Sequence, residues 1–229
     1  MVSFTPESKK NEKNIAKSAT NWLNNKKILK SILNENDWKV RLFLVEKTHD
    51  ENILKAIAKK DSNRDVRISA VKKLIDEDAL KNIAKKDSDW KVRLDAVKKI
   101  IDETILADIA ENNSDWKVRR AAVKKISDEE ILISIAKNNT DSKVRCSAAK
   151  KIKDDNILIF LAKNHHDIDL RMVATEKLND KNILADIAKN DVDWKIRLRA
   201  VEKLTDKNLL TDISKKDNNQ EVRLAASKK

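Results

Sequence analysis

The sequence of 229 residues contains no glycine and no tyrosine, one proline (Pro6) and one cysteine (Cys146). Without glycine, the chain lacks the residue needed for a phosphate-binding loop, a Rossmann turn or the tight hairpin turns of sheet proteins. A single cysteine excludes a disulfide framework and a thiolate zinc site. The longest apolar run is too short to cross a bilayer, so we expect no membrane association. The N-terminal residues lack the hydrophobic stretch of a signal peptide, so we expect a cytoplasmic protein.

What the chain does contain is charge. Charged residues make up 38% of the sequence and hydrophobic residues 40%, and the 50 Lys and Arg outnumber the 38 Asp and Glu to give a net charge of +12. The apolar share is enough for a hydrophobic core in a chain of this length. With glycine-dependent sheet classes excluded, the composition predicts an all-helical protein.

A Val-Arg pair recurs every 26 residues, without insertion, across eight copies. Such strict self-similarity is typical of repeat architectures. We number each copy from its aliphatic residue, which is position 0, so that the arginine is at +1. The pair or a close variant stands at Val40-Arg41, Val66-Arg67, Val92-Arg93, Val118-Arg119, Val144-Arg145, Leu170-Arg171, Ile196-Arg197 and Val222-Arg223.

The apolar spacing predicts two short helices in each copy. One helix carries apolar residues at 0, +4, +5 and +8, as in residues 89–100, and Asp89 suits its N-cap. The other follows an aspartate at +10, again a suitable N-cap, and carries apolar residues at +13, +14, +17 and +18. Asparagines such as Asn113 and Asn139 stand where the +10 helices end, and we expect them to adopt the left-handed conformation that glycine usually provides.

Neither helix is long enough to be stable alone, but stacked pairs would join their apolar stripes into one core. The sequence therefore predicts an all-α fold, an α-solenoid (superhelix) of eight tandem two-helix repeats with an N-terminal capping helix. We expect a tail and capping helix over residues 1–24. The repeat solenoid then spans 25–229, in units 25–50, 51–76, 77–102, 103–128, 129–154, 155–180, 181–206 and 207–229.

The run from Asp87 to Ile100 resembles the second half of a HEAT repeat, and it is also similar to the shorter leucine-rich-variant repeats. The resemblance covers residues 25–229. The unit is shorter than the usual HEAT repeat and lacks its prolines, and the cysteines of a leucine-rich-variant iron–sulfur segment are absent. The resemblance implies an Asp–Arg ladder between neighbouring repeats and a concave surface lined by the second helices.

The arginine at +1 lies in the middle of the apolar arc of its helix, where a guanidinium needs acceptors. Every copy offers an aspartate at −5 or −3, so we predict a structural ladder; the alternative is a row of phosphate-binding arginines. Arg119→Ala should then cost a few kcal/mol. The predicted ladder comprises Arg41, Arg67, Arg93, Arg119, Arg145, Arg171 and Arg197, with acids including Asp89, Asp115, Asp141 and Asp193.

A lysine at +7 is present in all eight copies, on the polar arc that also contains positions −1, +3 and +6. The charge of this arc sums to the +12 of the whole chain. A cationic groove for an acidic partner or a nucleic acid backbone is one interpretation. The other is a helix-dipole effect combined with a lysine-rich composition. The candidate binding residues are Lys73, Lys99, Lys125, Lys151, Lys177 and Arg199, and Lys125→Ala should leave stability nearly unchanged.

Tryptophan occupies position −2 in four copies, as Trp38, Trp90, Trp116 and Trp194. These indoles are candidate anchors for a peptide or for stacked bases. The alternative is that each packs over the preceding helix end as a staple.

The sequence offers no catalytic set. His165 and His166 fall in a predicted turn and Cys146 in a predicted core position, and we expect no enzyme activity, cofactor, metal or small-molecule substrate. Some HEAT-like proteins are DNA glycosylases, but no residue here carries that analogy. We therefore expect a non-catalytic scaffold that presents a basic concave surface to an unidentified protein or acidic peptide; the alternative is nucleic-acid binding through the lysines.

Overall fold

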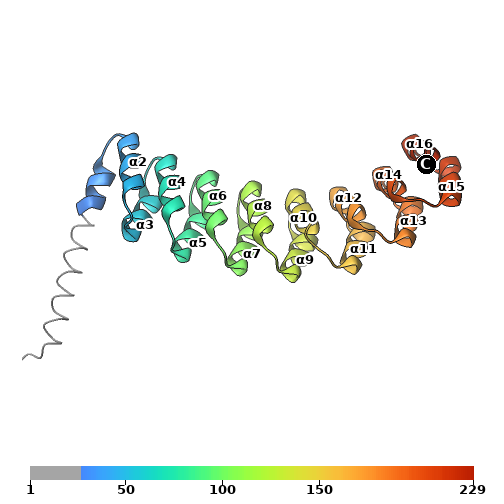
Figure 1. Cartoon of the computed structure of the whole chain (residues 1–229), viewed down its shortest axis with the longest axis horizontal. Helices are drawn as coiled ribbons and strands as arrows, with labels where there is room; N and C mark the ends of the chain where they lie inside the picture. Colours follow the sequence, from blue (N-terminus) through green and yellow to red (C-terminus); the bar gives the residue numbers. More distant parts are fainter. Residues whose placement is uncertain (1–26) are drawn as a thin grey trace, which may run out of the picture. The chain divides into compact units, whose positions relative to one another are not determined.

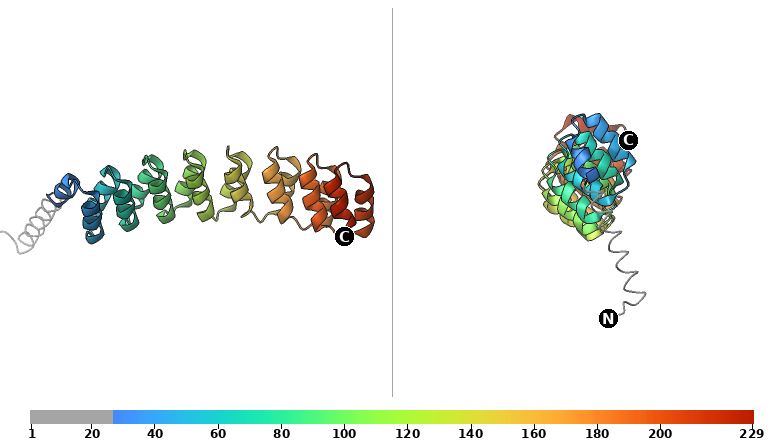
Figure 2. Two further views of the ribbon diagram at one scale, coloured as in Figure 1. Left: turned by 90° about the horizontal axis from the view of Figure 1, so that it is seen from above. Right: turned by 90° about the vertical axis from the view of Figure 1, so that its left-hand side faces the viewer.

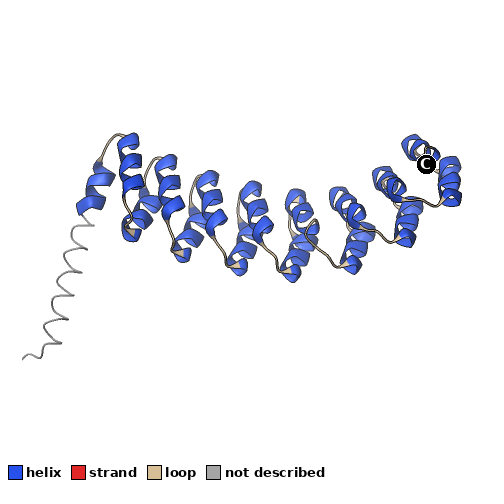
Figure 3. Ribbon diagram, viewed as in Figure 1, coloured by secondary structure: helices blue, strands red, loops and turns tan. Residues whose placement is uncertain are grey.

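A computed structural model describes residues 27–229, all of whose regular elements are helices (Figure 3). The predicted N-terminal capping helix lies outside the described residues. The chain divides into two compact segments, one ending at Ile100 and the other running from Ile101 to Lys229. Each segment is described by itself below.

From the second copy on, the first helix of a copy follows the aspartate at +10 of the preceding copy, and the second helix of every copy carries the Val-Arg pair. Both segments are built from these two helices in alternation, which confirms the predicted all-α solenoid architecture (Figure 1). In the first segment, residues 27–34 are helical and are followed by α2 (Trp38–Lys47), α3 (Glu51–Lys60), α4 (Arg64–Lys73), α5 (Glu77–Lys86) and α6 (Trp90–Lys99). The second segment comprises α7 (Glu103–Asn112), α8 (Trp116–Lys125), α9 (Glu129–Asn138), α10 (Ser142–Ala149), α11 (Asp155–Asn164), α12 (Ile168–Lys177), α13 (Lys181–Asn190), α14 (Trp194–Lys203), α15 (Lys207–Lys216) and α16 (Gln220–Ser227).

The period of 26 residues arises from helix and linker lengths that hardly vary. Most helices have ten residues, as α3 and α4 do, and three-residue linkers join them. The exceptions, α10 and α16, have eight residues each. Ten residues give nearly three helical turns. Because this length hardly varies, equivalent helices present the same residue positions to their neighbours in every copy.

Aspartate N-caps start most of the helices, as predicted, and Asn63 and Asn219 take this place in α4 and α16. Asp50 accepts a hydrogen bond from the backbone N–H of Ile53 at 2.9 Å, and Asp89 accepts one from Lys91 at 2.8 Å. The predicted left-handed asparagine caps are wrong: Asn113 has φ −70° and ψ 138°, which is extended. No residue of the described chain has a positive φ. Extended linkers leave the helices directly, and this explains how a chain without glycine makes so many reversals.

The helices of each segment stack side by side in two layers (Figure 2). Buried apolar residues recur at the same positions from copy to copy and form the core of each segment. In α4, Val66, Ala70 and Val71 are fully buried, and the equivalent positions of the later copies are buried too, except Ser227 at +5 of the last copy, which is exposed. Second helices of neighbouring copies pack closely, whereas first helices of neighbouring copies barely touch. In the second segment the second helices therefore line the inner side of the bend (Figure 1).

Candidate interaction surface

The arginine at +1 forms an ion pair with the helix-to-helix linker of the following copy. Arg41 Nε lies 2.8 Å from Asp61, and the two side chains are almost inaccessible, at 8% and 1% exposure. The same pairing recurs in both segments, in Arg67–Asp87 at 2.8 Å, Arg119–Asp141 at 2.8 Å, Arg145–Asp167 at 2.5 Å, Arg171–Asp191 at 3.2 Å and Arg197–Asp217 at 2.8 Å.

The guanidinium also donates hydrogen bonds to backbone carbonyls of its own copy. Arg67 Nη1 donates to the carbonyl of Asp61 at 2.9 Å, while Nε and Nη2 hold Asp87. Hydrogen bonding to Asp87 raises the pKa of Arg67, and hydrogen bonding to Arg197 lowers the pKa of Asp217. Because these arginines are buried and bonded on several sides, they do not form a row available to phosphate groups.

The structure corrects which acids act as partners. Where position −5 is aspartate, as in Asp87 and Asp191, that residue takes the arginine. The predicted Asp89 and Asp193 instead cap α6 and α14. Asp115 caps α8, and its predicted place in the ladder stays a prediction. Asp141, which follows a −5 asparagine, both caps α10 and pairs with Arg119. Arg93 is buried and donates to the carbonyl of Asp87 at 2.7 Å.

His165 replaces the −5 aspartate or asparagine in the sixth copy. Its Nδ1 accepts a hydrogen bond from the backbone N–H of Asp167 at 3.0 Å, and its Nε2 lies 3.4 Å from the carbonyl oxygen of Lys137. These two contacts require the neutral tautomer with the proton on Nε2. Burial lowers the pKa of His165, in agreement with this neutral form.

The lysines at +7 contact the end of a helix, as the helix-dipole interpretation expects, but the helix belongs to the neighbouring copy, which the sequence does not predict. Lys73 donates to the carbonyl of Glu46 at 2.7 Å, and Lys151 donates to that of Lys124 at 2.8 Å. Each ammonium therefore lies over the C-terminal end of the preceding second helix, where a positive charge satisfies free carbonyls and the helix dipole. Lys99 and Lys177 make the equivalent bonds, at 2.5 Å and 2.8 Å. Lys125 is half-buried at the matching position of α8.

The four tryptophans begin their second helices and are half-buried. A lysine ammonium from the same helix lies near each ring, at 5.9 Å from the centroid in Trp38 and Trp194 and at 5.8 Å in Trp90. Trp116 has two such neighbours, Lys117 at 5.9 Å and Lys143 of the next second helix at 4.3 Å. These distances allow cation–π attraction, so the Trp116 indole holds a lysine from α10 close to α8.

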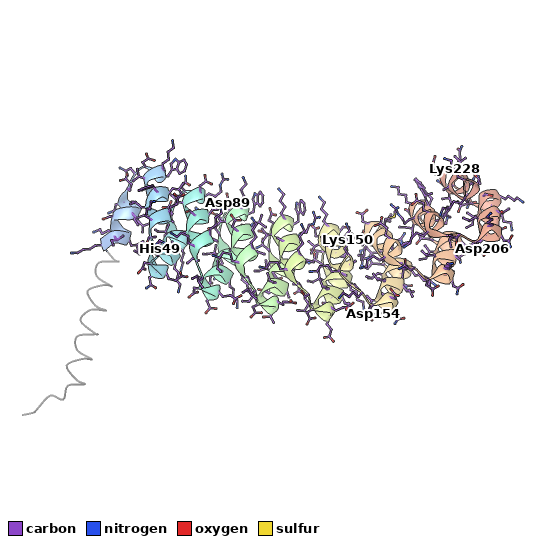
Figure 4. All side chains as sticks on the ribbon, in the orientation of Figure 1. His49, Asp89, Lys150, Asp154, Asp206 and Lys228 are labelled. Atoms are coloured by element: carbon purple, nitrogen blue, oxygen red, sulfur yellow. The ribbon has the colours of Figure 1, made fainter. Side chains whose placement is uncertain are left out.

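Exposed lysines occur along much of the described chain, but those of α8 and α10, together with Arg120, lie on two neighbouring helices that contain no acid. We define the α8–α10 basic cluster as the exposed residues Lys117, Arg120, Lys124, Lys143 and Lys150. Arg120 donates to the hydroxyl of Ser147 at 3.1 Å. Within residues 27–229, Arg120, Lys124, Lys143 and Lys150 pair with no carboxylate. Figure 4 labels Lys150 near the end of α10, and Asp154 marks the start of the next first helix.

These two helices also differ from the others in sequence. Residues 116–125 and 142–151 contain no aspartate or glutamate, whereas each of the other second helices in the described chain contains at least one. On α12 the exposed acids are Asp169 and Glu176. The lysines predicted to bind a partner lie at +7, whereas the exposed lysines of the cluster lie at −1 and +6. Their signal in the sequence is the absence of acids from two neighbouring second helices.

Arg199, another predicted binding residue, is already engaged in ion pairs. Its guanidinium lies 3.2 Å from Glu176 and 2.9 Å from Glu202. With Trp194 and Met172 it borders a shallow depression of about 220 Å³ on α12 and α14. The neighbouring carboxylates neutralise this part of the surface, so it differs in charge from the α8–α10 basic cluster.

In the part of the chain that the structure describes, no three His, Cys, Asp or Glu side chains come together as metal ligands. Burial raises the pKa of the Cys146 thiol, which is opposite to the shift that a reactive thiolate needs. Among the described helices, none has both the length and the apolar character to cross a bilayer.

Comparison of the sequence with known protein families gives no match, and a search of curated proteins finds no similar sequence.

Proposed function

We propose that the protein is a non-catalytic, cytoplasmic scaffold of HEAT-like repeats that binds another protein through its second helices. The carrying observation is the α8–α10 basic cluster, which is exposed, free of acids and not used in the ladder that holds the copies together. A repeat array is well suited to such a role because neighbouring second helices form one extended surface.

The composition of this surface supports a protein partner. Half-buried indoles at the helix starts and exposed lysine stems combine apolar area with charge, as interface residues commonly do. The half-buried Trp116 is the best candidate for an anchor in the second segment.

Crosslinking with mass spectrometry on the protein purified with its cellular partners tests the proposal. We expect a saturable complex of defined stoichiometry, with crosslinks on Lys117, Lys124 and Lys143 rather than on first-helix lysines such as Lys189. Crosslinks spread evenly over both helix layers, or no saturable complex, would contradict the scaffold.

Nucleic-acid binding is the second candidate, and the uninterrupted positive charge of α8 and α10 favours it. Its affinity for duplex or single-stranded DNA or RNA should then fall steeply as salt is raised, because each neutralised phosphate releases counterions. A mobility-shift titration at low salt that shows no complex would exclude this candidate.

A further inference from the structure

We infer that the α8–α10 basic cluster is a docking site for a short acidic peptide segment of the protein partner, with carboxylates facing Lys117, Arg120, Lys124, Lys143 and Lys150. The inference deepens the scaffold function proposed above and rests on it.

Charge complementarity indicates that the ligand is negatively charged. The cluster brings five cationic groups onto two adjacent second helices, and α8 and α10 pack directly against each other. Like charges held together on one surface repel each other, so a bound anion relieves this repulsion as well as adding attraction. The exposed lysine heads remain solvated, which makes the attraction dependent on salt.

The extent of the cluster gives the length of the ligand. A ten-residue helix such as α8 is about 15 Å long, and packed helices lie roughly 8–10 Å apart. An extended peptide advances about 3.3 Å per residue, so about five residues cover the cluster. On α12 the surface changes sign, since Asp169 and Glu176 are exposed there.

This change of sign favours an acidic peptide over a nucleic acid. A long phosphate backbone that followed the second helices of this segment would meet carboxylates directly after the cluster. Bases that stacked on Trp116 would also have to displace Lys143, whose ammonium lies 4.3 Å from the ring centroid. A short acidic segment fits within the two acid-free helices.

The test measures binding of a fluorescent glutamate decapeptide at low salt to the wild-type protein and to Lys124→Glu/Lys150→Glu. The matched control is Lys72→Glu/Lys228→Glu, which changes the same +6 position on α4 and α16 by the same total charge; both control lysines are exposed. We expect saturable binding that weakens about tenfold or more in the cluster variant and less than about twofold in the control.

Two results would overturn the inference. Equal weakening in both variants would mean that binding follows net charge alone, and an oligonucleotide of equal charge that binds more tightly than the peptide would identify a nucleic-acid site. Lys124→Gln/Lys150→Gln repeats the test without charge reversal, and thermal melting checks that each variant is folded. If the partner found by crosslinking binds the Lys124→Glu/Lys150→Glu variant with the same affinity as the wild type, the inferred acidic segment is contradicted, but the proposed scaffold function is not.

Discussion

At the scale of single residues, the ladder arginines show how a copy selects its partner. The guanidinium at +1 pairs with the aspartate at −5 of the following copy where one exists. Where −5 is Asn139 or His165, it pairs with the aspartate at −3. The two arrangements are unequal. Arg145 reaches Asp167 through both Nε and Nη2, whereas Arg119 reaches Asp141 through Nη2 and its buried Nε has no hydrogen-bond partner within the described residues.

This difference predicts an order of stability. Arg145→Ala should lower the free energy of unfolding by roughly 3–5 kcal/mol, because it leaves the nearly buried Asp167 carboxylate without its cation. Arg119→Ala should cost less, since Asp141 is 24% exposed and is solvated more easily. Urea denaturation followed by circular dichroism measures both. An equal cost would show that the second hydrogen bond contributes nothing.

A residue-scale change should also stabilise the protein. The hydroxyl of Thr175 is fully buried and has no hydrogen-bond partner in the described part of the chain, while Val97, Val123 and Val201 occupy the same repeat position. Thr175→Val removes an unsatisfied polar group at constant shape and should add about 1 kcal/mol, or roughly 2–4 °C in Tm. Thr211→Val is the control, because that exposed hydroxyl donates to Lys207 and its replacement should bring no gain.

The environment of His165 predicts that the thermal stability of the protein depends on pH. The Nδ1 of His165 accepts a hydrogen bond from the backbone N–H of Asp167, and its Nε2 lies near the carbonyl oxygen of Lys137. Protonation of the ring breaks the bond to Asp167 and adds a positive charge close to Arg145. Because burial holds the folded pKa of His165 below the unfolded value of about 6.5, its contribution is present above that pH and is lost as pH falls through the folded pKa. His165→Asn should flatten the fall in Tm between about pH 7 and 5. An unchanged profile in that variant would assign the effect to another group.

At the scale of the helix, the C-terminal carbonyls of a second helix are satisfied by the next copy of the same segment. The lysine at +7 covers the carbonyls at the end of the preceding second helix, as Lys151 does for α8. Helix ends usually satisfy these groups with a glycine cap or with water. Here the chain has no glycine, and the neighbouring copy provides the donor instead.

The near-silent substitution expected at +7 is therefore revised. Lys151→Met keeps the apolar stem but removes the ammonium, and it should cost about 1 kcal/mol through unsatisfied carbonyls and the lost dipole interaction. Lys150→Met, next to it but exposed, should change stability by less than about 0.5 kcal/mol. Thermal melts of the two variants give the comparison, and equal values would argue against a role for the lysine in ending the helix.

At the scale of the whole molecule, the connections between copies vary along the chain. Glu129, at the start of α9, accepts hydrogen bonds from the backbone N–H groups of Lys153 and Asp154 at 2.7 Å and 2.9 Å, and these bonds lower its pKa. Glu51 and Glu103 make the equivalent bridges in their copies. In the seventh copy a lysine, Lys181, occupies this position and has no carboxylate to offer.

Amide hydrogen exchange should report this difference. The N–H groups of Lys153 and Asp154 should exchange more slowly than those of Thr205 and Asp206, the equivalent pair after Lys181, because a hydrogen-bonded amide must open before it exchanges. Glu129→Ala should raise the exchange of the first pair to the rate of the second. Similar rates in the wild-type protein would mean that the bridge does not persist in solution.

The sequence alone determined the helices, their order, the aspartate caps and the buried positions, because apolar spacing and a strict period of 26 residues act locally and recur in every copy. The tertiary structure decided what the charged residues do. Whether Asp87 or Asp89 meets Arg67, and whether Lys151 faces solvent or a helix end, depends on the distance between neighbouring copies. That distance is set by packing of the shared core, which no single repeat contains.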